Sequence, residues 1–196
     1  MGKKLNIIDL FCGCGGLSLG FENAGFNILL GIDMWEDALV TYRRNHKNGN
    51  TLCADLASLP VEEVDKAINH KNVDVIIGGP PCQGFSIAGK RIVDDDRNKL
   101  YKSFVRMVAY FKPKAFVLEN VPNILSIGEG AVREAIINDF SELGYMVTYK
   151  VLLAADYGVP QKRYRVLIVG IDQELGLGEF NFDSLIDLVH DLNIPS

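Results

Sequence analysis

Apolar runs of strand length alternate with segments of helical periodicity along most of this chain, and this alternation leaves few folds open to it. The strand-like runs are residues 5–11, 27–33, 51–54, 73–77, 115–118, 145–153 and 165–171. The helical segments are residues 17–24, 36–45, 61–68, 98–111 and 131–143. Repeated β-α-β units give a parallel sheet with helices on both faces, and strands joined without a helix pair antiparallel. We therefore predict an α/β fold, a doubly wound, mostly parallel sheet whose last two strands form an antiparallel edge.

Length and apolar content fit one globular domain. The chain has 196 residues, of which 48% are hydrophobic, and single domains commonly contain roughly 100–200 residues. No apolar stretch approaches the ~20 residues that span a bilayer. The start, Met1-Gly2-Lys3-Lys4, leads directly into strand-like sequence, without the apolar core or cleavage site of a signal peptide. We expect a cytoplasmic protein.

Cysteines and histidines give no sign of a metal site. The four cysteines stand at positions 12, 14, 53 and 82, which agrees with a reducing compartment. Their spacing does not supply the two ligand pairs of a zinc site, and no histidine completes one. His46, His70 and His190 are scattered among polar residues, so we predict that all three lie at the surface.

The net charge of −5 is unevenly distributed. Residues 172–196 carry six acidic and no basic side chains, so residues 1–171 hold 20 Lys and Arg against 19 Asp and Glu. A neutral body gives little nonspecific attraction to phosphates. Basic clusters at residues 90–91, 97–102 and 162–165 could still position a phosphate locally.

The turn after the first strand is rich in glycine. It reads Asp9-Leu10-Phe11-Cys12-Gly13-Cys14-Gly15-Gly16, and glycines let a backbone turn sharply and approach a ligand in front of a helix amino terminus. Asp33 closes the second strand, where an acid can bind ribose hydroxyls. Asp55 follows the third strand and could accept from an adenine amino group. Each aspartate could instead cap a helix, but together with the turn they indicate a nucleoside pocket without a polyphosphate site.

A cysteine follows the buried strand at residues 73–77. The connecting sequence is Gly78-Gly79-Pro80-Pro81-Cys82-Gln83-Gly84-Phe85-Ser86, so a stiff Pro-Pro turn delivers the thiol at the carboxyl end of a strand, where open α/β sheets bind ligands. The next segment, to residue 99, is polar and charged. A rigidly presented thiol beside such a loop suggests covalent chemistry on an enclosed substrate.

In these motifs the chain resembles the cytosine-5 DNA methyltransferases, from residue 5 to about residue 171. The turn at residues 9–16 resembles that family's S-adenosylmethionine motif, in which the Phe packs on the adenine. Asp33 matches its ribose-binding acid and Asp55-Leu56 its adenine-binding pair. Further matches are Pro80-Pro81-Cys82-Gln83 for the nucleophile, Glu119-Asn120-Val121 for cytosine binding, and Gln161-x-Arg163-x-Arg165 for the late arginine motif.

The resemblance implies a class I, Rossmann-like fold and methyl transfer from S-adenosyl-L-methionine to carbon 5 of a cytosine flipped out of double-stranded DNA, with S-adenosyl-L-homocysteine as product. The implied catalytic residues are Cys82, Glu119, Arg163 and Arg165. The implied cofactor-binding residues are Asp9, Phe11, Gly13, Gly15, Gly16, Leu17, Asp33, Met34, Asp55, Leu56 and Pro81. Candidate DNA contacts are Gln83, Ser86, Lys90, Arg91 and Arg97. Taken singly, Glu119 could be a surface carboxylate and the two late arginines a solvated edge-strand pair.

The sequence departs from the family after Ile171, where a target-recognition region and two more motifs would follow. Residues 182–192 instead carry an apolar stripe at helical spacing. We divide the chain into a catalytic and cofactor-binding domain, residues 1–171, and an acidic extension, residues 172–196, with a helix. Our hypothesis is a split subunit or a fragment from a restriction-modification system, completed by a second polypeptide or a missing segment. An RNA cytosine-5 methyltransferase and a non-catalytic cofactor-binding module remain alternatives.

Overall fold

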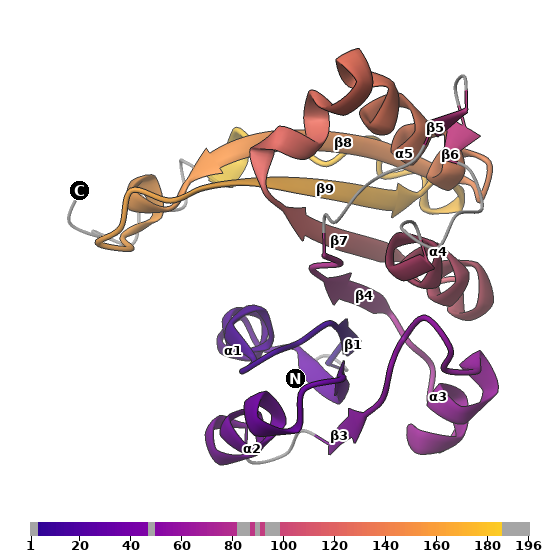
Figure 1. The fold of residues 1–196 in the computed structure, drawn as a ribbon, viewed down its shortest axis with the longest axis vertical. Helices are drawn as coiled ribbons and strands as arrows, with labels where there is room; N and C mark the ends of the chain where they lie inside the picture. Colours follow the sequence, from indigo (N-terminus) through magenta and orange to yellow (C-terminus); the bar gives the residue numbers. More distant parts are fainter. Residues whose placement is uncertain (1–3, 47–49, 82–86, 89–90, 93–98, 186–196) are drawn as a thin grey trace.

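The structure is a computed structural model that describes residues 4–46, 50–81, 87–88, 91–92 and 99–185 (Figure 1). Its strands are β1 (Asn6–Leu10), β2 (Asn27–Asp33), β3 (Asn50–Cys53), β4 (Val75–Gly78), β5 (Ile87–Ala88), β6 (Arg91–Ile92), β7 (Ala115–Asn120), β8 (Tyr145–Leu153) and β9 (Tyr164–Asp172). Its α-helices are α1 (Gly16–Asn23), α2 (Glu36–Asn45), α3 (Val61–Ala67), α4 (Lys99–Phe111) and α5 (Ala131–Ser141).

Seven strands form one sheet in the order β3-β2-β1-β4-β7-β9-β8, and β5 and β6 form a separate antiparallel ribbon. The strands from β3 to β7 are parallel, whereas β9 runs antiparallel to β7 and β8. The predicted doubly wound sheet with an antiparallel edge is therefore confirmed. The strand order reverses between β1 and β4, and open α/β sheets bind ligands outside the carboxyl ends of the strands at such a point.

Helices cover both faces of the sheet (Figure 1). Buried residues of α3, α4 and α5 form one large core with β1, β2, β4, β7 and β9, and Phe104, Phe116 and Phe140 pack together within it. The opposite face carries a smaller cluster, Ile7, Ile28, Val75 and Ile77, against which α1 packs, and α2 adds Leu39 and Tyr42 beside Cys12. Because helices cover both faces of the sheet, a ligand-binding site has to lie at the ends of the strands.

Most element boundaries agree with the sequence prediction, but β7 is longer than predicted. It continues through Glu119 and Asn120 because both pair with β9, opposite Leu167 and Val166. The sequence could not reveal this pairing, because β9 follows 44 residues later. The extension places Glu119 on a fixed strand rather than in a loop.

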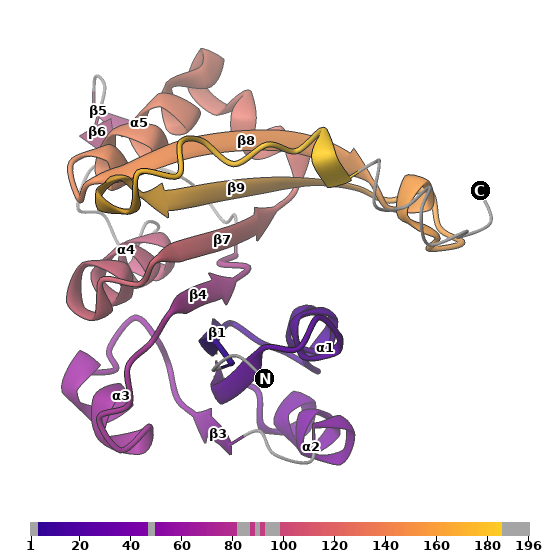
Figure 2. The ribbon, with the colours of Figure 1, turned by 180° about the vertical axis from the view of Figure 1, so that it is seen from behind.

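The described part of the acidic extension lies along β8, on the face away from α5 (Figure 2). The Thr148 hydroxyl donates to the Phe180 carbonyl, and Lys150 pairs with Asp183. The helix predicted over residues 182–192 falls mostly outside the described residues. In the described part of the chain, no helix is long and apolar enough to cross a membrane.

One carboxyl group lies inside the core at the end of β1. Asp9 is 1% exposed, and the Ser18 hydroxyl donates to its Oδ2 over 2.6 Å. Burial raises the pKa of Asp9 from 3.8 to about 7, and the charge of Asp33 adds to the rise, while the Ser18 hydrogen bond opposes it. Between about pH 4 and pH 7, Asp9 is therefore protonated in the folded protein and ionised in the unfolded chain.

The aromatic core predicts a strong effect of adding one methyl group to β9. A Cβ at Gly170 would lie 2.0 Å from the Phe116 ring, whereas a Cβ at Gly20 of α1 would meet nothing within 4 Å. Gly170→Ala should lower the free energy of unfolding by about 2 kcal/mol, because the buried ring must move. Gly20→Ala, the matched control, should raise it by about 0.5–1 kcal/mol through helix propensity. Urea unfolding measures both, and equal stability of the two variants would contradict the packing described.

Asp9 predicts a stability that falls as pH rises. Because its pKa is raised on folding, the folded state binds the extra proton and loses this advantage toward pH 7. Between pH 5 and pH 8, the wild type should lose about 3 kcal/mol more unfolding free energy than Asp9→Asn, at 1.36 kcal/mol per pKa unit. Urea unfolding of both proteins at the two pH values measures the difference. The same pH dependence in both proteins would show that Asp9 ionises normally.

Candidate active site

The glycine turn after β1 is held in an unusual backbone conformation. Phe11, Gly13 and Gly15 all have positive φ, at 60°, 52° and 88°, and for Phe11 this conformation is strained. Two hydrogen bonds fix the turn to the end of β2. The Cys12 N–H donates to the Ile32 carbonyl over 3.0 Å, and the Gly13 N–H donates to Asp33 Oδ2 over 2.9 Å. The chain thus ties the end of β1 to the end of β2 before α1 begins.

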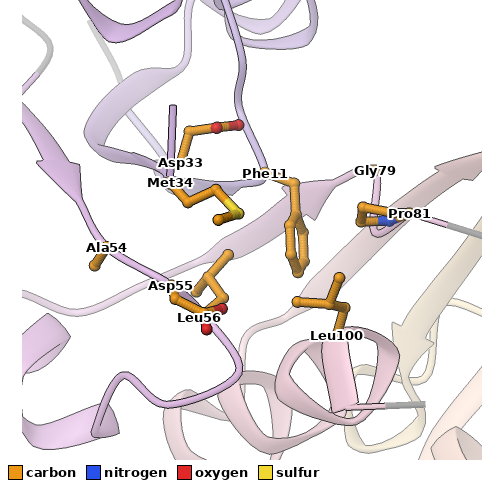
Figure 3. A pocket seen from close by; sticks show the side chains of 9 residues that line it. All are labelled: Phe11, Asp33, Met34, Ala54, Asp55, Leu56, Gly79, Pro81 and Leu100. Atoms are coloured by element: carbon orange, nitrogen blue, oxygen red, sulfur yellow. The ribbon is translucent and has the colours of Figure 1, made fainter. Parts of the chain in front are cut away.

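A first cavity of about 190 Å³ opens beside this turn (Figure 3). Its lining comes from the carboxyl ends of β1, β2, β3 and β4 and from the start of α4. The lining residues are Phe11, Asp33, Met34, Ala54, Asp55, Leu56, Gly79, Pro81 and Leu100. Figure 3 shows the Phe11 ring extending toward Leu100, with Leu56 and Met34 on the other side of the space. Apolar faces with carboxylates at one side suit a flat base carrying polar edges.

Asp33 and Asp55 both serve the backbone as well as the cavity. Asp33 Oδ1 accepts from the Trp35 N–H and Asp55 Oδ1 accepts from the Ala57 N–H, each over 2.9 Å. The alternative that these aspartates cap helices is not what the structure shows, because each bonds the N–H two residues on in a turn, and the N-cap of α2 is Trp35. Each carboxylate oxygen has a second lone pair, so both groups can still accept hydrogen bonds from a ligand.

A second cavity of about 670 Å³ adjoins the first. It is lined by Asp9, Phe11, Cys12, Gly16, Leu17, Gly79, Glu119, Ala154, Val159 and Arg163. Phe11 and Gly79 line both cavities, so the two spaces meet between β1 and β4. Two of the predicted catalytic residues, Glu119 and Arg163, thus lie in the same region as predicted cofactor residues.

Glu119 is the fixed carboxylate of this region. Its Oε1 lies 2.8 Å from Nε of Arg165, and the two side chains are 30% and 28% exposed. A Cβ added at Gly79 would lie 3.1 Å from Glu119 Oε2, so the carboxylate rests beside the backbone that leads to Pro81. Arg165 lies on β9, an inner strand of the sheet, which excludes the alternative of an edge-strand arginine.

Asn120 holds the Pro-Pro turn. Its side chain is 5% exposed, and its Nδ2 donates to the Pro80 carbonyl over 2.8 Å while its Oδ1 accepts from the Val121 N–H. Pro80 cannot be held through a backbone N–H, because proline has none. The buried Asn120 amide of β7 therefore fixes the backbone at Pro80, two residues before Cys82 in the sequence.

Sequence reasoning missed four residues around the first cavity: Ala54, Gly79, Leu100 and Arg106. Leu100 contributes the α4 wall. Arg106 donates to the Leu56 and Leu59 carbonyls, each over 2.9 Å, and so ties α4 to the loop that carries Asp55. The available signal was an arginine between core residues of α4, where an exposed side chain can still reach backbone acceptors on the neighbouring loop.

Not every predicted residue lines the cavities. Gly13 and Gly15 form the glycine turn but line neither cavity. Arg165 pairs with Glu119, which lines the second cavity. Five predicted residues lie outside the described ones: Cys82, Gln83, Ser86, Lys90 and Arg97. Arg91 is described only as part of the β6 backbone. The roles of all these residues stay predictions.

The surface prediction for the histidines is wrong for His46. Its side chain is 2% exposed and pairs with Glu22 of α1, because the last turn of α2 packs onto the glycine turn. His70 is exposed and pairs with Asp65, as predicted for a surface residue, and His190 lies outside the described residues. Cys12, Cys14 and Cys53 are free, and the described residues contain no cluster of three His, Cys, Asp or Glu side chains suited to a metal ion.

Comparison with known proteins extends the resemblance over nearly the whole chain. Residues 5–192 match the family model of the C-5 cytosine-specific DNA methylases. The Type II methyltransferase M1.HphI of Haemophilus parahaemolyticus is 48% identical over 170 residues, which are 85% of this chain and 46% of that protein. The Type II methyltransferase M.AquIA of Picosynechococcus sp. is 41% identical, and the match covers 87% of this chain and 72% of that protein.

A solved structure shares the fold. The crystal structure of a DNA modification methyltransferase encoded within a prophage (E. coli) matches with a TM-score of 0.79 at 36% identity, over 90% of this chain and 49% of that one. The chain thus spans about half the length of most of the curated relatives it matches. The shared fold is the Rossmann-like fold of S-adenosylmethionine-dependent methyltransferases. On its sequence and its structure alike, this chain belongs to the C-5 cytosine-specific DNA methylase family.

Proposed function

We propose that this chain is the catalytic part of a DNA (cytosine-5)-methyltransferase of the restriction-modification type, using S-adenosyl-L-methionine as methyl donor. One observation carries the proposal: Glu119, held by Arg165, stands beside the Gly79–Pro81 turn where the two cavities meet. The next residue along the chain is Cys82. With Cys82 next in the chain, the acid and the thiol would share the space in front of a nucleoside-sized cavity.

The first cavity suits the adenosine part of the donor. Phe11, Leu56 and Leu100 offer apolar faces for the purine, Asp33 offers lone pairs for the ribose hydroxyls, and Asp55 offers them for the exocyclic amino group. The reactive sulfonium would then face Gly79 and the second cavity, with the amino-acid end toward Asp9. Bound there, the donor would supply an electrophilic methyl group to the neighbouring base.

The chain's own groups would activate the cytosine, whose carbon 5 is a weak nucleophile. The Cys82 thiolate would form a bond to carbon 6, which moves electron density to carbon 5. Glu119 would donate a hydrogen bond or proton to ring N3 and stabilise the charge that this addition creates. Carbon 5 would then bond to the methyl group as the bond between that methyl and the donor sulfur breaks, which leaves S-adenosyl-L-homocysteine. After carbon 5 has lost its proton to water, the Cys82 sulfur would leave, the ring double bond would form again, and the N3 proton would return to Glu119. Arg165 would keep Glu119 aimed at the base, and Arg163, at the wall of the second cavity, would hold the exocyclic oxygen.

We propose double-stranded DNA as the substrate, because relatives 41–48% identical are named Type II methyltransferases. The target carbon is inside the duplex, so the base must be flipped out of the stack. We further propose that sequence recognition comes from protein beyond these 196 residues, on the same chain or on a second polypeptide, because most relatives are about twice as long. The substrate places such an enzyme in the bacterial cytoplasm.

Covalent trapping tests the nucleophile. On duplex DNA containing 5-fluorocytosine, carbon 5 cannot lose a proton, so the Cys82 adduct should persist and shift the protein on a denaturing gel when S-adenosylmethionine is present. Cys82→Ser should abolish the adduct and still bind S-adenosylhomocysteine, because the exchange of sulfur for oxygen leaves Phe11, Asp33 and Asp55 of the first cavity unchanged.

Cys53→Ser is the matched control, because Cys53 is free, exposed and outside both cavities, and it should trap normally. The assay uses the chain alone and with the product of the neighbouring reading frame. Trapping retained in Cys82→Ser would refute the assignment. Labelled methyl transfer to transfer RNA that DNA does not compete away would move the proposal to an RNA substrate.

Glu119→Gln tests the acid at ring N3. The amide keeps the size of the side chain but cannot protonate the ring, so turnover should fall about 100-fold, in the usual range for loss of acid–base catalysis. Affinity for S-adenosylhomocysteine should stay within about twofold, because Glu119 does not line the first cavity. Methyl transfer and calorimetry measure the two quantities. Glu142→Gln, an exposed carboxylate after α5, is the control, and an equal loss of turnover there would remove the specific role.

A further inference from the structure

A buried chain of hydroxyl groups lies behind the glycine turn. Ser18 of α1 donates to Asp9 Oδ2 over 2.6 Å, and the Tyr42 hydroxyl of α2 lies 2.8 Å from Ser18 Oγ. Asp9, Ser18 and Tyr42 are each at most 1% exposed. When Asp9 is ionised, the single Ser18 proton is used toward its carboxylate, so Tyr42 must then donate to Ser18. Burial raises the pKa of Tyr42 above its usual range, which keeps this donor protonated.

The Tyr42 ring also forms a platform with His46. The two ring centroids are 4.2 Å apart at an interplanar angle of 31°. His46 Nδ1 lies 2.5 Å from Glu22 Oε2, so the last turn of α2 is fastened to α1. A Cβ added at Gly15 would lie 2.2 Å from His46 Nε2 and 2.7 Å from the Tyr42 ring. The backbone of the glycine turn therefore rests directly on the two rings.

None of the four supporting side chains touches the space that a ligand would fill. Ser18, Glu22, Tyr42 and His46 line neither cavity. They act instead on residues that line the second cavity. Ser18 bonds the cavity residue Asp9, and Glu22 belongs to α1, which starts at the cavity residue Gly16. This support is built from two helices and is independent of the groups that face the base.

We propose that Ser18, Glu22, Tyr42 and His46 are positioning residues for the methyl donor, holding the glycine turn and the Asp9 carboxyl in the arrangement that receives its amino-acid end. The inference rests on the proposed use of S-adenosylmethionine and extends it to residues that no ligand contacts. Tyr42 is the central member, because it supports the turn with its ring and Asp9 with its hydroxyl.

The hydroxyl chain also sets the charge of Asp9. The groups that face Asp9 are Ser18 from α1, Tyr42 from α2, the Cys12 thiol from the turn and Asp33 from β2. Glu119 and Arg163 share its cavity. An ionised Asp9 attracts the ammonium group of the donor, so affinity should rise with pH through the Asp9 pKa, about 7. Without the Tyr42 hydroxyl, the Ser18–carboxylate bond weakens and the midpoint should move to higher pH.

The test compares two removals of a buried tyrosine hydroxyl. Tyr42→Phe keeps the ring platform and removes only the bond to Ser18. Tyr145→Phe is the matched control, because Tyr145 is 6% exposed, donates to the Pro113 carbonyl over 2.7 Å, and starts β8 away from both cavities. Calorimetry with S-adenosylhomocysteine from pH 6 to 8.5 should give a dissociation constant about fivefold higher for Tyr42→Phe at neutral pH, with the pH midpoint moved upward. The control should bind as the wild type does.

Hydrogen exchange in the ligand-free chain gives a readout that needs no donor. The amides of residues 13–16 should exchange faster in Tyr42→Phe than in the wild type or in Tyr145→Phe. Ser18→Ala breaks the same link and should show the same changes if Tyr42→Phe does not fold. Wild-type affinity, pH midpoint and exchange in both Tyr42→Phe and Ser18→Ala would overturn the inference, and so would an equal loss in the control. Failure of the wild type to bind S-adenosylhomocysteine would contradict the proposed function instead, while the exchange comparison still decides the positioning role.

Discussion

The site depends on how closely the ends of β1 and β4 approach each other. Leu10 and Gly78 are paired in the parallel ladder, and a Cβ on Gly78 would lie 2.2 Å from the Leu10 carbonyl oxygen. Only glycine allows this approach. It brings the glycine turn after β1 beside the Gly79–Pro81 turn after β4, at the point where the strand order reverses. The methyl donor and a cytosine bonded to the nucleophile would need this proximity, because the methyl group would pass directly from the donor to carbon 5 of the base.

The sequence was sufficient for the architecture because its signals are local. Strand runs, amphipathic helices and glycine turns each specify their own segment, and the β-α-β rule then fixes how parallel strands are joined. The first cavity was also accessible, since Phe11, Asp33, Asp55 and Leu56 each end or follow a strand, and the ends of parallel strands meet at one edge of the sheet. The fold and the first cavity could therefore be predicted, because both follow from the order and direction of the strands.

Contacts between distant segments could not be predicted from the sequence. His46 stands in polar sequence and is nevertheless buried, because α2 lies against the turn after β1, about 30 residues earlier. Arg106 reaches carbonyls 47 and 50 residues away, and Asn120 reaches a carbonyl 40 residues away. Arg106 and Asn120 bond backbone carbonyls of other segments, and His46 pairs with the Glu22 carboxylate of α1. Such needs become visible only when the elements have been placed in space.

The groups that face the cavities are largely held before any ligand arrives. The Asp33 carboxylate bonds two backbone N–H groups, Glu119 is paired with Arg165, and the turn before Cys82 is held by Asn120. The positive φ of Phe11 costs free energy that the surrounding hydrogen bonds and packing must offset during folding. Since orientation is settled at that stage, less of the binding energy of a donor or a flipped base would be needed to order the protein. Folding and ligand binding would therefore be coupled, because a substitution that loosens the glycine turn weakens the scaffold and the site together.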